Sequence, residues 1–244
     1  MLSGLDNLRV FEDPESLGRA AAEQVLRIAG HHLDASRRFT LALAGGTTPA
    51  LAYRRLAAGR TSSDWSRWEV FFGDERCVPN DHADSNYRMA REALLDHVPI
   101  PAERVHPMVT DPDHPEADAT RYEDLIRERV QAEDGMPVLD LVLLGLGADG
   151  HTASLFPGTD ILGVHDRLVA SVYVERLGSH RISLTYPLLN QARHILFLVA
   201  GESKAALIVE LERGAEPGRY PVQGLAPQGT VEWYLDRAAA SGLS

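Results

Sequence analysis

The order in which apolar runs and helix-like stretches follow one another most constrains the fold of this chain. The apolar runs have the length of strands, and most lack a two-residue alternation, as expected for strands that are covered on both faces. They occupy residues 39–44, 68–74, 138–145, 168–174 and 194–200.

Helix-like stretches separate these runs. The first is introduced by Asp13, Pro14 and Glu15, which offer an N-cap, a first-turn proline and an early acid. The stretches span residues 16–33, 48–59, 85–98, 115–133, 202–214 and 230–240. Strands that alternate with helices predict an α/β protein with a mainly parallel, doubly wound, Rossmann-like sheet. No internal repeat or low-complexity tract divides the chain, and we therefore expect residues 1–244 to form a single domain.

Charge and cysteine content narrow the function. The chain carries 24 Lys and Arg against 35 Asp and Glu, a net charge of −11, which argues against nucleic acid or an anionic membrane surface as partner. An anionic substrate would therefore need a locally positive pocket. Cys77 is the only cysteine, so no intrachain disulfide is possible, which suits a reducing compartment. The start has no signal-peptide pattern and no apolar run approaches a membrane span, so we expect a cytoplasmic protein.

Polar signals follow four of the predicted strands. They are "GGTTP" at residues 45–49, "DER" at 74–76, "GADGH" at 147–151 and "GESK" at 201–204. In an open parallel sheet, ligands bind beyond the carboxyl ends of the strands. The four segments therefore predict one shared site.

The segment after the first predicted strand suits a phosphate group. Gly45 and Gly46 let the backbone approach a ligand, Thr47 and Thr48 offer hydroxyls, and the following helix presents free N–H groups and a positive dipole end. An ordinary β–α turn is the alternative interpretation. A Walker loop is excluded, because its lysine-containing pattern is absent.

The glycines after the third of these strands have the spacing of a dinucleotide-binding turn, G-x-G-x-x-G, at Gly145, Gly147 and Gly150. That turn must open a full helix, and Pro157 interrupts the chain soon after the third glycine. Although Glu175 lies near the place of a ribose-binding acid, the missing helix argues against a nicotinamide enzyme.

The remaining content of this loop suits acid–base chemistry. Asp149 precedes His151 by two residues and could orient its ring, which favours a functional histidine. Ser154 lacks the G-x-S-x-G context of a nucleophile, so we expect it to cap or pack the turn. The ten histidines are dispersed and no H-E-x-x-H occurs, so no metal site is predicted.

Five motifs follow one another along the chain: "GGTTP", "GDERCVP" followed by "SNYRMA", "GLGADGHTASLFPG", "RISLTYPLLNQA" and "GESKA". Taken together, they resemble those of the 6-phosphogluconolactonases, whose general plan is shared by the more distant glucosamine-6-phosphate deaminases. The resemblance extends from about Phe11 to Trp233. It implies a sheet of the glucosamine-6-phosphate deaminase and ribose-5-phosphate isomerase type. One departure is Ala44 before Gly45, where many relatives have serine.

The implied reaction is hydrolysis of 6-phosphoglucono-δ-lactone to 6-phosphogluconate, in the oxidative pentose phosphate pathway, with no metal or organic cofactor. The resemblance implies that His151 is the general base and that Asp149 holds its tautomer. Lys204, Arg181 and the loop 45–48 are then expected to clamp the phosphate.

Two further residues have alternative roles in this scheme. Arg76 could bind either the phosphate or the oxyanion. Asp74 matches a catalytic acid position of the deaminases, and here it could position sugar hydroxyls or anchor Arg76.

Two rival functions stay open at this stage. Another sugar-phosphate deaminase or isomerase would share the fold and clamp, although "DGHTASLFPG" fits the lactonase pattern. A noncatalytic sugar-phosphate sensor would need only the clamp, and would normally be joined to a DNA-binding segment for which the sequence leaves no room. We expect a small phosphorylated lactone as the partner, no nucleic acid or membrane, and a monomer.

Overall fold

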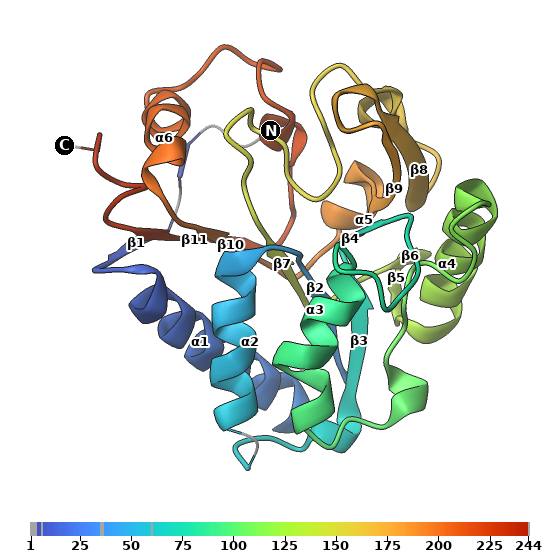
Figure 1. The fold of residues 1–244 in the computed structure, drawn as a ribbon. Coiled ribbons are helices and arrows are strands. Elements are labelled where there is room, and N and C mark those ends of the chain that lie inside the picture. Colours follow the sequence, from blue (N-terminus) through green and yellow to red (C-terminus); the bar gives the residue numbers. More distant parts are fainter. Residues whose placement is uncertain (1–3, 6, 35–36, 60, 244) are drawn as a thin grey trace.

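The computed structural model describes residues 4–5, 7–34, 37–59 and 61–243. Its central element is a six-stranded sheet in which all neighbouring strands run parallel, in the order β1-β11-β10-β7-β2-β3 (Figure 1). The mainly parallel sheet predicted from the sequence is thus confirmed. Its strands are β1 (Leu8–Phe11), β2 (Phe39–Leu43), β3 (Trp68–Phe72), β7 (Leu141–Leu144), β10 (His194–Val199) and β11 (Thr230–Asp236).

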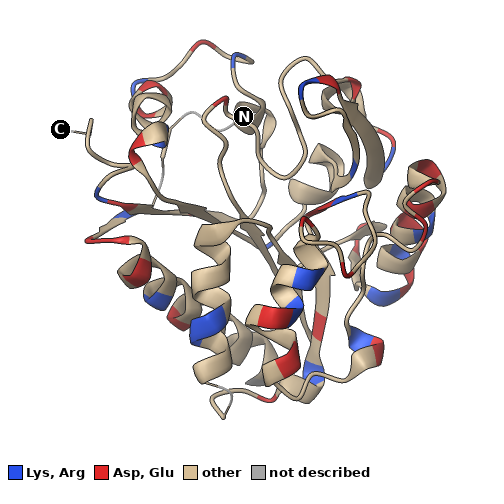
Figure 2. Ribbon diagram, in the orientation of Figure 1, with Lys and Arg blue, Asp and Glu red and all other residues tan. Residues whose placement is uncertain are grey.

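The central strands are covered on both faces, which explains their uninterrupted apolar runs. Every residue of β2, β3 and β7 is buried. Charged residues lie mainly on the outer helices and loops, and few lie on the central strands (Figure 2).

Helices flank the sheet on its two sides. Helices α1 (Pro14–Asp34), α2 (Thr47–Ala58) and α3 (Asn86–Ala93) lie together on one side, and α6 (Ala205–Glu212) lies on the other (Figure 1). As the sequence suggests, Asp13 accepts a hydrogen bond from the backbone of Ser16 at the start of α1, at 2.7 Å. In the described part of the chain, no helix is both long and apolar enough to cross a membrane.

A second sheet of three antiparallel strands adjoins the first. It contains β4 (Asp74–Arg76), β9 (Ser179–Leu184) and β8 (Val169–Val174), in that order. Gly73 connects the two sheets, because its N–H donates to Leu43 and its carbonyl accepts from Leu184. Helices α4 (Pro115–Arg129) and α5 (Tyr186–Leu189) and a hairpin of β5 (Ala132–Glu133) and β6 (Met136–Pro137) complete the fold.

One element prediction is wrong. Residues 230–240 were expected to be helical, but β11 occupies Thr230–Asp236 and inserts between β1 and β10. Burial overrides the helix-like composition here, since the strand contains Trp233, Tyr234 and Leu235, all essentially inaccessible. The predicted strand at 168–174 is confirmed as β8, which lies in the antiparallel sheet.

Candidate active site

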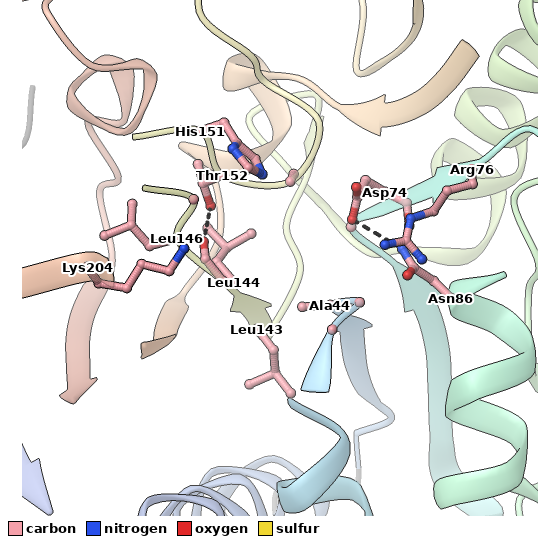
Figure 3. A pocket seen from close by; sticks show the side chains of 16 residues that line it. Ala44, Asp74, Arg76, Asn86, Leu143, Leu144, Leu146, His151, Thr152 and Lys204 are labelled. Atoms are coloured by element: carbon pink, nitrogen blue, oxygen red, sulfur yellow. Dashed lines mark hydrogen bonds between the residues drawn. The ribbon is translucent and has the colours of Figure 1, made fainter. Parts of the chain in front are cut away.

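A cavity of about 250 Å³ opens at the carboxyl ends of β2, β3 and β7, where the sequence predicts the site (Figure 3). Segments distant in the sequence meet here: the loop after β2, strand β4, the start of α3, the loop after β7 and the turn before α6. The lining residues are Ala44, Gly45, Gly46, Gly73, Asp74, Arg76, Asn86, Leu143, Leu144, Gly145, Leu146, Gly147, His151, Thr152, Ala153 and Lys204.

Six of the ten residues expected in the site line this cavity directly: Gly45, Gly46, Asp74, Arg76, His151 and Lys204. The other four lie around it. Asp149 contacts His151 through the Nδ1 atom of the ring. Arg181 lies on β9, directly opposite Arg76 on the neighbouring strand β4. Thr47 and Thr48 form the first turn of α2, directly after the glycines.

His151 is held by Asp149 through its Nδ1 atom. Asp149 Oδ1 lies 2.5 Å from Nδ1 and also accepts the backbone N–H of His151 at 3.3 Å. With Nδ1 donating to the carboxylate, Nε2 is the ring nitrogen that carries the free lone pair. The Phe156 ring packs against the imidazole, with 4.2 Å between centroids. The ring is therefore fixed in position and in tautomer.

The glycines of this loop make room for the histidine. A Cβ atom on Gly147 would lie 1.9 Å from His151 Nδ1, so any other residue would displace the ring. Gly150 has φ +76°, a conformation that favours glycine. A Cβ atom at this position would also lie 2.7 Å from the Tyr220 side chain. Two of the glycines with dinucleotide-like spacing are therefore needed for the conformation of the loop that carries His151.

Asp149 is shared between His151 and Arg176. Its Oδ2 lies 2.5 Å from Arg176 Nη2, while Oδ1 faces His151. Burial raises the pKa of Asp149, but the hydrogen bonds and charge of His151, together with the charge of Arg176, outweigh it and leave the pKa below its usual value. Asp149 is accordingly the ionised partner of the pair.

Strand β4 directs Asp74 and Arg76 toward the cavity and Glu75 away from it, because side chains alternate along a strand. Glu75 is buried and accepts the backbone N–H groups of Asn86 and Tyr87, the first two residues of α3. Burial raises its pKa, although these hydrogen bonds oppose the rise. Glu75 therefore fastens α3 to the strand that carries Asp74 and Arg76.

Asp74 is tied to the histidine loop by Ser154. The buried Ser154 hydroxyl donates to Asp74 Oδ2 at 2.7 Å, and Asn86 Nδ2 donates to the Asp74 carbonyl at 2.9 Å. Ser154 therefore has the packing role expected from the sequence, with a partner that the sequence did not indicate. Asp74 is positioned by both contacts beside the cavity.

The loop after β2 requires glycine. A Cβ atom on Gly45 would lie 2.0 Å from Asn86 Oδ1, and Gly46 has φ +104°. The Tyr53 hydroxyl bonds both the N–H and the carbonyl of Ala44, at 2.9 and 2.8 Å, and holds the end of β2. The loop backbone is therefore fixed beside Asn86.

Three cations surround the cavity in an otherwise acidic protein. Burial lowers the pKa of Lys204, and the negative charge of Asp149 opposes this. Burial and then the positive charge of Arg76 lower the pKa of Arg181. Close positive charges of this kind are relieved when an anion binds between them.

Sequence reasoning missed Asn86, Arg176 and Phe156. Asn86 stands in the quoted "SNYRMA" motif, after the Ser85 N-cap that accepts from Arg88 N–H, and this helix start could have indicated it. Arg176 carries no local signal, since its contacts to the histidine loop are purely tertiary. In the described residues, no three His, Cys, Asp or Glu side chains gather as a metal site would require.

Comparisons with known proteins identify the family. The chain matches the family described as glucosamine-6-phosphate isomerases/6-phosphogluconolactonase over residues 12–233. It is 48% identical over 206 residues to the 6-phosphogluconolactonase of Synechocystis sp., which covers 84% of each chain. The solved 6-phosphogluconolactonase from Trypanosoma cruzi has a TM-score of 0.86 at 30% identity, covering 100% of this chain and 98% of that chain.

The same fold also occurs outside the lactonases. A monomeric glucosamine-6-phosphate deaminase has a TM-score of 0.81 at 21% identity, covering 97% of this chain and 99% of that chain. At that identity the likeness establishes the fold, which is the deaminase type expected from the motifs. The chain therefore belongs to the glucosamine-6-phosphate isomerase/6-phosphogluconolactonase family.

Proposed function

We propose that this protein hydrolyses 6-phosphoglucono-δ-lactone to 6-phosphogluconate. The observation that carries the proposal is the His151–Asp149 pair, with its free Nε2, in one cavity with Arg76 and Lys204. Relatives that are 34–48% identical over most of this chain are named 6-phosphogluconolactonase. An oriented base and nearby cations are what the hydrolysis of a phosphorylated lactone requires.

His151 is the base in this mechanism. Neutral Nε2 takes a proton from water as the water oxygen attacks the lactone carbonyl, and Asp149 stabilises the imidazolium that forms. The tetrahedral oxyanion then expels the ring oxygen as the C–O bond breaks. The imidazolium returns its proton to that oxygen, so the product is the open-chain acid and the base is regenerated.

The cations divide two tasks. Lys204, Arg181 and the loop 45–48 hold the phosphate, through charge and the N–H groups at the start of α2. Arg76 is the last residue of β4 and lines the cavity, where it binds either the phosphate or the developing oxyanion. Asp74, already bonded to Ser154, orients sugar hydroxyls through its remaining acceptor capacity.

An assay with freshly generated lactone tests the function. The lactone also hydrolyses spontaneously, so the enzymatic rate is the excess over a blank without protein. We expect a large excess rate with the lactone and no ammonia release from glucosamine 6-phosphate. Ammonia release would favour the deaminase alternative, and binding without turnover would favour a sensor.

The remaining expectations concern the state of the protein. We propose that it works as a cytoplasmic monomer, because one chain supplies every residue of the cavity and its single cysteine suits a reducing compartment. Light scattering at micromolar concentration tests the monomer.

A further inference from the structure

Arg176 completes a closed ring of four side chains around the proposed base. Its Nη2 lies 2.5 Å from Asp149 Oδ2, and its guanidinium carbon lies 4.9 Å from the centroid of the Phe156 ring. Phe156 in turn packs against His151, whose Nδ1 contacts Asp149 Oδ1. Arg176 belongs to the turn Glu175–Leu177 between β8 and β9, a hairpin beside the loop that follows β7 (Figure 1).

This closed arrangement of four side chains gives each carboxylate oxygen of Asp149 one partner. Oδ1 faces the histidine and Oδ2 faces the arginine, so Asp149 cannot rotate without losing both contacts. The side chains of Asp149 and His151 are 29% and 28% exposed, whereas that of Arg176 is 53% exposed. Arg176 thus lies on the solvent side and shields the pair.

We propose that Arg176 is a positioning residue that holds Asp149 and Phe156 against His151 and draws part of the carboxylate's charge away from the imidazole. This inference rests on the proposed function, in which His151 must be neutral to accept a proton. A carboxylate already paired with a guanidinium stabilises an imidazolium less than a free one does. Arg176 therefore helps to keep the base neutral at lower pH.

Other groups also face the pair and must be considered. Lys204 interacts electrostatically with Asp149 from the turn before α6. Tyr220 packs against Gly150, but its hydroxyl donates to Glu210 at 2.7 Å. Asp74 reaches the same loop through the Ser154 hydroxyl. Of these groups, Arg176 is the one in direct contact with Asp149 Oδ2.

The test compares pH profiles of kcat for the wild type, Arg176→Gln and Arg176→Lys. Exposed ion pairs contribute about 0.2–1 kcal/mol, and one pH unit corresponds to about 1.36 kcal/mol. We therefore expect Arg176→Gln to move the acidic limb upward by roughly 0.2–0.7 pH unit, with KM changed less than about 2-fold. Arg176→Lys should recover part of the shift, and added salt should shrink it.

Arg219→Gln is the matched control. Arg219 is 54% exposed, pairs with Glu210 at 2.9 Å and lies 5.2 Å from the Tyr220 ring centroid, but it has no described contact with Asp149 or His151. Its acidic limb should coincide with that of the wild type. A profile of Arg176→Gln that also coincides with the wild type would overturn the proposal. So would a rate lowered equally at every pH, since that indicates a purely structural role.

An NMR titration of the His151 ring separates this inference from the proposed function. It needs no turnover, so it applies even if the wild type hydrolyses no lactone. We expect the titration midpoint in Arg176→Gln to lie above that of the wild type by the same 0.2–0.7 pH unit, roughly. Identical midpoints would refute the role of Arg176, whereas an inactive wild type with shifted midpoints would refute only the lactonase proposal.

Discussion

Ser154 Oγ donates a hydrogen bond to Asp74 Oδ2 across 2.7 Å, and this bond joins the loop that carries His151 to the strand that carries Arg76. These two segments are about 80 residues apart in the sequence and belong to different parts of the fold. The bond therefore fixes the distance between the proposed base and one of the proposed cations.

Replacing Ser154 by Ala should affect both stability and rate. The change removes a hydrogen bond to the half-buried carboxyl group of Asp74, and such a bond contributes about 0.5–1.5 kcal/mol. We expect a lower free energy of unfolding in urea and a lower kcat, because His151 and Arg76 are no longer held in register. Ser241 is exposed, so Ser241→Ala is the control. It should match the wild type in both stability and kcat. Unchanged stability of Ser154→Ala would contradict the role of the bond.

Gly45→Ala should disrupt the loop after β2. The new Cβ would stand 2.0 Å from Asn86 Oδ1, so Asn86 or the loop must move, at a cost of about 1–3 kcal/mol. We expect a lower melting temperature and weaker binding of 6-phosphogluconate. At Gly163 the same substitution meets nothing within 4 Å, and its effect should stay within roughly 0.5 kcal/mol. Equal effects of the two substitutions would exclude this steric account.

Lys204 can be observed directly, because it is the only lysine in the sequence. Burial lowers its pKa, so the neutral, reactive amine should form at lower pH than the roughly 10.4 of an unperturbed lysine. Acetylation followed by peptide mass spectrometry should show a rate that rises with pH at a midpoint below that value. The bound phosphate of 6-phosphogluconate should keep the amine protonated and slow the reaction.

The N-terminal amine serves as the internal control for this labelling. Its reaction should be indifferent to 6-phosphogluconate. If saturating 6-phosphogluconate leaves the acetylation of Lys204 unchanged, Lys204 is not part of the phosphate clamp.

Arg181→Ala should reduce the preference for phosphorylated over plain gluconolactone. A charge-assisted contact to phosphate contributes about 1.5–3 kcal/mol, which corresponds to a loss of roughly 10- to 150-fold in kcat/KM for the phosphorylated lactone alone. The rate with plain gluconolactone should change little, since it has no phosphate to lose. Unaltered discrimination between the two lactones would remove Arg181 from the clamp.

The sequence predicted the location of the site better than it predicted the strands of the sheet. The carboxyl ends of parallel strands meet at one edge of a sheet, so four polar segments at strand ends were sufficient to locate Gly45, Arg76, His151 and Lys204 together. Strand β11 was missed because its burial on the sheet, rather than its local pattern, decides its structure.

The parts of the site that depend on tertiary contacts could not be predicted. Arg176 lies in an exposed turn, and only the folding of the β8–β9 hairpin brings it to Asp149. Likewise, nothing in "DER" distinguishes Glu75 from its neighbours. Strand alternation and the N–H groups of α3 make Glu75 a buried anchor, with its carboxylate occupied by those donors.

The central claim is that His151 removes a proton from water, and His151→Asn tests it most directly. Circular dichroism and the affinity for 6-phosphogluconate should stay close to those of the wild type, since the fold and the cations are intact. The excess rate of lactone hydrolysis over the blank should fall by roughly 10²- to 10⁴-fold, the usual contribution of a positioned base. A His151→Asn protein that folds, binds 6-phosphogluconate and keeps nearly all of the excess rate would contradict the mechanism.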